Sequence, residues 1–118
     1  FVQNAATRKI VSGRDILTGF DKEKIRNKIA EYSLHQLSVV NEGIYRHLEV
    51  EKVRDKEIKT YTSNLMSYFE FLTKNCKEAA AHFANLYVQK TYPHAIQFIA
   101  SSCPMMVMML VTYVKGIK

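Results

Sequence analysis

Four histidines and two cysteines are the side chains of this chain with the most versatile chemistry, because they ligate metals and act as bases or nucleophiles. Metal centres in helical bundles are commonly built from Glu-x-x-His pairs on facing helices. None of the four histidines has a glutamate three positions before it; they are His35, His47, His82 and His94. Two acid–histidine pairs stand four residues apart, the spacing of ordinary partners on a helix surface, namely Glu31/His35 and Glu78/His82. We therefore predict no metal site.

The signatures of the common enzyme classes are also missing. There is no Gly-x-Ser-x-Gly, no glycine-rich phosphate-binding loop and no His-Glu-x-x-His. Cys76 and Cys103 show no metal-type spacing, and two cysteines are too few for a disulfide scaffold. We expect both to be buried free thiols, although a bridge between two helices stays open if the protein is exported. The residues predict a non-enzymatic protein without a cofactor.

Basic residues gather in the N-terminal quarter of the chain. They are Arg8, Lys9, Arg14, Lys22, Lys24, Arg26 and Lys28. Seven cations against three acids leave an excess of four charges there, out of a net charge of +6. On a helix, Lys22 and Arg26 share one side and Lys24 and Lys28 share another, on either flank of an apolar stripe. We predict a basic rim over residues 22–28 that contacts a protein partner.

Phosphate contact is the alternative use of this basic rim, with nucleic acid or another anionic surface as the ligand. No helix-turn-helix, zinc-finger or strand-based RNA-binding signature supports it. A solvated helix face explains the charge pattern as well. A second candidate surface is the aromatic segment 68–72, because Phe71 lies beside the main apolar stripe and Tyr68 lies on it.

The C-terminal run from Met105 to Val114 is the most apolar part of the chain. It holds four of the five methionines: Met105, Met106, Met108 and Met109. The run is about half as long as the roughly 20 residues that a membrane-spanning helix needs, and no basic face accompanies it. We predict that it forms the central helix of a bundle. If its methionines line a cavity instead of filling the core, the protein would carry a lipid or another small apolar ligand.

Helices must position all of these residues, because four glycines and two prolines in 118 residues are too few for sheets and their turns. We expect an all-α, compact bundle of four to six helices in one domain, residues 1–118. A short helix and a turn are expected over 1–20, and long amphipathic helices over 21–91. Two short helices are expected over 92–118, beginning at Pro93 and Pro104, where proline suits the first turn.

Caps and breakers predict the other helix boundaries. Gly13 should end the first helix, and Asp21 should begin the next. Gly43 is expected to break or bend its helix, at a cost of roughly 1 kcal/mol if it does not. The charged segment 49–59 has like charges four residues apart, which predicts a junction between helices. Asn75 should mark another pause.

Together these features favour a helical interaction module that binds a protein partner through a basic and aromatic surface. An exported pathogen surface or effector protein would suit such a compact bundle. We expect a soluble chain without a membrane span, either cytoplasmic or exported, and no signal-peptide pattern is visible in it. A carrier of an apolar ligand and a nucleic-acid binder remain the alternative functions.

Overall fold

The computed structural model describes residues 11–20 and 23–117. Within these ranges the chain forms seven helices and no strand, which confirms the all-α prediction and exceeds the expected four to six helices. The helices are α2 (Gly13–Gly19), α3 (Glu23–Ala30), α4 (Leu34–Val50), α5 (Asp55–Asn75), α6 (Lys77–Val88), α7 (Pro93–Ser102) and α8 (Pro104–Ile117).

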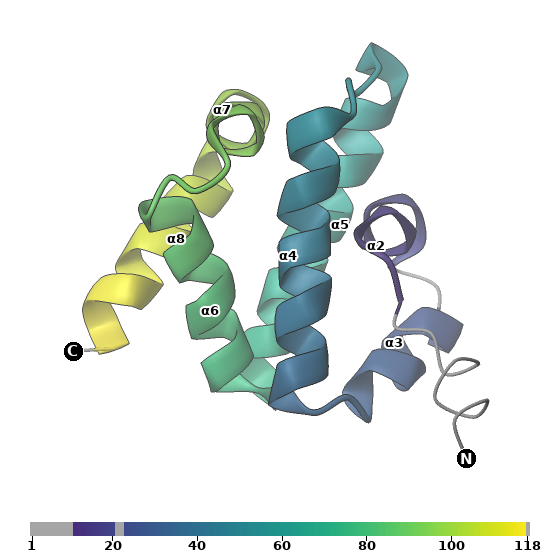
Figure 1. Cartoon of the computed structure of the whole chain (residues 1–118), viewed down its shortest axis with the longest axis vertical. Helices are drawn as coiled ribbons and strands as arrows, with labels where there is room; N and C mark the ends of the chain where they lie inside the picture. Colours follow the sequence, from purple (N-terminus) through teal and green to yellow (C-terminus); the bar gives the residue numbers. More distant parts are fainter. Residues whose placement is uncertain (1–10, 21–22, 118) are drawn as a thin grey trace.

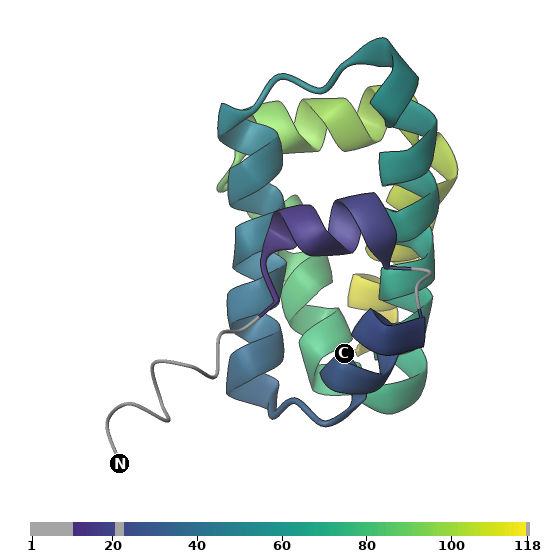
Figure 2. The same ribbon diagram turned by 90° about the vertical axis from the view of Figure 1, so that its right-hand side faces the viewer.

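The long helices α4 and α5 form the middle of the fold (Figure 1). Helices α2 and α7 each pack against both of them, and Figure 2 shows these two shorter helices lying across the space between α4 and α5. Helix α6 also packs against both, on the side away from α2. Helix α8 packs against α6 and α7 and lies at the edge of the molecule.

Several helix boundaries agree with the local sequence signals. Helices α7 and α8 begin at Pro93 and Pro104, and α5 ends at Asn75. The segment between α4 and α5 falls inside the expected junction at 49–59. An additional break separates α3 from α4, where the Ser33 hydroxyl accepts from the Gln36 amide at 3.3 Å and Gln36 caps the Ser33 amide in return at 2.9 Å.

Two predicted boundaries are wrong, and both concern glycine. Gly13 begins α2 and does not end a helix, because Ser12 is the N-cap and shares a capping box with Asp15. Gly43 lies in the uninterrupted helix α4. A side chain at Gly13 would overlap the Gly43 backbone, so the two glycines permit a close crossing of α2 over α4. Asp21 lies outside the described residues.

The core between the helices is rich in aromatic side chains. The rings of Tyr68 and Phe69 on α5 are essentially buried, as is Phe20, whose ring packs edge-on against Tyr68. Phe83 of α6 contacts Tyr68 and Phe69 with centroid distances of 5.9 and 5.7 Å. Such contacts add to the stability that apolar burial provides.

A polar network crosses this core between α4, α5 and α6. The Tyr68 hydroxyl donates to the Asn41 side-chain oxygen at 2.7 Å, and the Asn41 amide lies 3.0 Å from the Ala79 carbonyl. The same amide nitrogen is 3.1 Å from Nδ1 of His82, whose Nε2 lies 3.7 Å from Glu42. Burial lowers the pKa of His82, and the nearby Glu42 carboxylate opposes this in part. The network fixes the register of the three helices.

Helix α8 is not the central helix, which corrects the prediction from its composition. Met106 and Leu110 are fully buried, whereas the side chains of Met105 and Met108 are 70% and 72% exposed. The middle of the fold is occupied by α4 and α5, so α8 has neighbours on one side only. Because α8 is apolar on all sides, its composition did not predict which of its faces would be buried.

Candidate functional site

Three of the four cations of the predicted basic rim, Lys24, Arg26 and Lys28, lie in the described helix α3. Arg8, Lys9 and Lys22 lie outside the described residues. On α3, the exposed Arg26 places its guanidinium 5.1 Å from the centre of the Phe20 ring, a cation–π contact. Lys24 is also exposed, but residues two positions apart on a helix point about 200° away from each other.

Lys28 and Arg14 complete the predicted basic set. Lys28 is exposed one turn after Lys24, and Arg14 lies on α2. Lys24 and Lys28 thus share one side of α3, Arg26 points to another, and Arg14 lies on a separate helix.

The aromatic segment of α5 divides between core and surface. Tyr68 is completely buried, so the prediction that it contacts a partner is wrong. Its position between Leu65 and Leu72 on the apolar stripe accounts for this burial. Phe71 is half-buried, packs against Phe20, and lines a hollow of about 270 Å³ together with Arg26 and Lys74. The structure thus brings two separately predicted site residues, Arg26 and Phe71, together.

The four methionines of α8 do not line a common cavity. Met106 fills the core, and Met105 extends from the start of α8 into solvent. Met108 and Met109 together line a shallow hollow of about 370 Å³. The predicted four-methionine pocket is therefore wrong within the described part of the chain, because a helical turn directs neighbouring side chains to different faces.

A continuous apolar depression follows α8 where it meets α5 and α6. The first hollow, of about 370 Å³, is lined by Phe69, Thr73, Met108, Met109, Thr112 and Tyr113. The second, of about 560 Å³, is lined by Lys77, Glu78, Ala81, Thr112, Tyr113 and Gly116. Both share Thr112 and Tyr113, so they are adjacent parts of one surface. We call the two hollows together the apolar groove.

Tyr113 forms the ridge between the two hollows and is held in place at both ends of its side chain. Its ring packs edge-on against Phe69 at a centroid distance of 5.7 Å, and its hydroxyl donates to the Lys77 carbonyl at 3.1 Å. Burial and the nearby Cys76 raise the pKa of Tyr113, so the hydroxyl remains a donor at neutral pH. A fixed ridge of this kind gives the groove a preformed shape.

The charge around the apolar groove is uneven. Residues 91–114, which include α7 and most of α8, contain no Asp, Glu, Lys or Arg. The ionised side chains lie at the α6 end of the groove, where Lys77 and Glu78 contribute to its lining. Lys115 is exposed on α8, about one turn after the groove residue Thr112 and directly before Gly116. This end of the groove therefore has more positive than negative charge.

Two other kinds of site have no support among the described residues. No group of three metal-ligating side chains is found in them. Cys76 and Cys103 are free thiols, half-buried and buried, and burial raises the pKa of Cys103.

No described helix is by itself long and apolar enough to cross a membrane. Helices α7 and α8 meet that test only as a pair, and they are bent by 117° at their junction.

Comparisons with known proteins give no relative. The chain matches no protein-family model, no curated protein and no solved structure. Sequence reasoning missed the apolar groove, although the absence of charge over residues 91–114 was a signal for it.

Proposed function

We propose that this protein binds a protein partner by accepting an amphipathic helix in the apolar groove on α8. The observation that carries the proposal is the pair of adjoining apolar hollows on either side of Tyr113, next to the strongly exposed Met108. Contiguous exposed apolar surface is typical of interaction sites. Helix-in-groove binding uses such a surface with apolar anchors on one face of the ligand.

The two hollows specify the apolar face of the ligand. Because they adjoin along α8, a bound helix can place one apolar anchor in each, with a separation of one turn or two. Met108 and Met109 are flexible and polarizable, so they adapt to the shape of the first anchor. Tyr113 separates the anchors and sets their spacing.

The charges specify the polar flank of the ligand. Lys77 and Lys115 stand near one end of the groove against Glu78. Acidic residues at one end of the bound helix would complement this excess and orient the ligand. The partner is thus a helical segment with apolar anchors and an acidic end. The binding surface of this protein stays basic and aromatic, as predicted from the sequence, but we place it on α8.

A peptide selection tests this proposal. Helical peptides selected from a displayed random library against the whole protein should carry apolar residues at i, i+3 or i+4, and i+7, with acidic residues at one end. Their affinity should fall about tenfold in Met108→Gln, because one well-buried apolar contact is worth on the order of 1.4 kcal/mol. Met105→Gln is the matched control, since Met105 has the same exposure but does not line the groove.

Equal affinity of the selected peptides for wild type and Met108→Gln would overturn the assignment of the groove. A fatty acid that binds tightly and perturbs Met108, with no peptide enriched, would also overturn it in favour of an apolar-ligand carrier. Thr112→Glu provides a second variant, because it puts a charge between the two hollows from an exposed position that the fold tolerates. It should abolish binding of the same peptides.

A further inference from the structure

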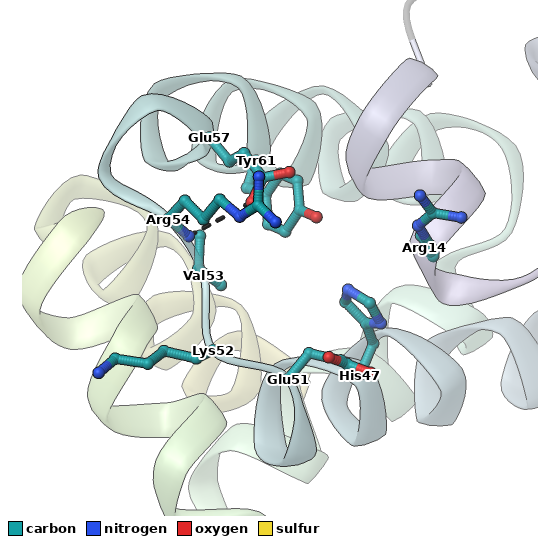
Figure 3. A pocket seen from close by; sticks show the side chains of 8 residues that line it. All are labelled: Arg14, His47, Glu51, Lys52, Val53, Arg54, Glu57 and Tyr61. Atoms are coloured by element: carbon teal, nitrogen blue, oxygen red, sulfur yellow. Dashed lines mark hydrogen bonds between the residues drawn. The ribbon is translucent and has the colours of Figure 1, made fainter.

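A second hollow, very different from the apolar groove, lies at the other end of α5. It has a volume of about 490 Å³ and is enclosed by the end of α4, the segment 51–54, the start of α5, and α2. Arg14, His47, Arg54 and Tyr61 surround its centre, and Figure 3 shows Lys52 extending away from it. We call it the charged hollow.

The cations of the charged hollow are not neutralised by contact within the described structure. Neither Arg14 nor Arg54 forms an ion pair with any described carboxylate. The carboxylate of Glu57 also lines the hollow and accepts from the Arg54 amide at 3.3 Å in the cap of α5 (Figure 3). Glu51 is exposed at the border of the hollow. Two guanidinium groups thus line one space, Arg14 from α2 and Arg54 from the segment that precedes α5.

Neutral donors complete the lining. Tyr61 is only 5% exposed, and its ring lies 6.2 Å from the ring of His47, measured between centroids. Burial raises the pKa of Tyr61, with Glu57 adding to this and Arg14 opposing it, so the phenol keeps its proton. The Tyr61 hydroxyl and the His47 ring both point toward the space between α2 and α5 (Figure 3).

We propose that the charged hollow binds the phosphoryl group of a small phosphate ester, with Arg14, Arg54 and the Tyr61 hydroxyl as its donors. A phosphoryl group offers three acceptor oxygens, and the fork of an arginine matches two of them. The hollow is larger than a phosphoryl group and falls in the size range of small-molecule sites. Val53 and the His47 ring offer apolar surface to the organic part of the ester.

The geometry favours a small ester over a nucleic-acid strand. A polynucleotide needs a continuous basic track for its successive phosphates. Here Glu51 and Glu57 stand at the border of the hollow and interrupt any such track. The hollow therefore has room for one anionic group with a neutral remainder.

Titration of the whole protein with phenyl phosphate, followed by backbone and histidine NMR shifts, tests this proposal. Saturable shifts should be confined to the residues of the charged hollow. Arg54→Gln and Arg14→Gln should each weaken binding about tenfold, and Tyr61→Phe a few-fold, as expected for donors to a charged acceptor. Arg46→Gln is the matched control, because Arg46 neighbours His47, pairs with Glu42 at 3.4 Å and does not line the charged hollow.

Three results would overturn the proposal. The first is an equal loss of affinity in Arg46→Gln, which would mean that only overall charge matters. The second is benzoate binding as tightly as phenyl phosphate, because the site would then select a carboxylate. The third is binding of a short single-stranded DNA, sensitive to Arg54→Gln, without saturable binding of phenyl phosphate.

Discussion

The two ends of α5 meet surfaces of opposite character. Near its start, the charged hollow gathers arginine, glutamate, histidine and tyrosine around one space. Near its end, the apolar groove is formed with α8, most of which belongs to a stretch of 24 residues, 91–114, without Asp, Glu, Lys or Arg. A single scaffold thus offers one surface suited to an anion and another suited to an apolar helix. Both surfaces are open hollows, so their shapes do not distinguish them. The chemistry of their lining residues therefore decides which ligand each one binds.

The largest effect on stability is expected from removing the buried side chain that anchors α8 on the bundle. Met106→Ala should destabilise the protein by about 3 kcal/mol, because it leaves a cavity at a fully buried position. Met105→Ala, at the neighbouring exposed position, should change stability by no more than about 0.5 kcal/mol. Urea denaturation of both variants measures their free energies of unfolding. Equal effects would contradict the one-sided burial of α8.

The next largest effect is expected at the other surface. Gly13→Ala should cost about 2 kcal/mol, because its methyl group would overlap the Gly43 backbone and push α2 away from α4. The variant should also weaken phenyl phosphate binding, since α2 carries Arg14, while leaving peptide binding in the apolar groove intact. Gly116→Ala is the control, because nothing lies within 4 Å of the added atom. Thermal unfolding of the two variants provides the measurement.

A smaller effect on stability is expected from the buried polar network that includes His82. Burial lowers the pKa of His82 in the folded protein, below the value near 6.5 of an unfolded chain. The unfolded state therefore binds more protons below about pH 6.5, and the stability that neutral His82 contributes is present above this pH and lost as the pH falls. His82→Gln should flatten the slope of stability between pH 7 and 5, whereas replacing the exposed His35 by Gln should leave it unchanged. The two slopes come from urea titrations at each pH.

The sequence predicted the features of the fold that local chemistry determines. Pro93 and Pro104 begin helices and Asn75 ends one, because caps and breakers act within a few residues. The break at Ser33 has an equally local cause in its capping box with Gln36, and this signal was overlooked. The predicted break at Gly43 was wrong because this glycine acts in tertiary packing: it allows the backbone of Gly13 in α2 to approach α4 closely.

The candidate surfaces were harder to predict, for the same reason. Met105 and Met106 are identical neighbours, and only the packing of α8 on one side of the bundle makes one exposed and the other buried. Tyr68 looked like a surface residue within an unusually aromatic segment, yet it bonds Asn41 in the core. Arg14 was grouped with the other basic residues of the N-terminal quarter, but Arg54 and Tyr61, distant in sequence, line the same hollow. Such juxtapositions depend on how the helices cross.

We propose that the two surfaces are separate sites with different ligands. One NMR sample labelled on methionine methyl groups and backbone amides tests it directly. A selected amphipathic peptide should shift Met108 and Met109 while leaving Met105, His47 and Tyr61 in place. Phenyl phosphate, added to the same sample, should shift His47 and Tyr61 and leave the methionines unchanged. Overlapping sets of shifted resonances, or a peptide that moves Met105 in place of Met108, would contradict the claim.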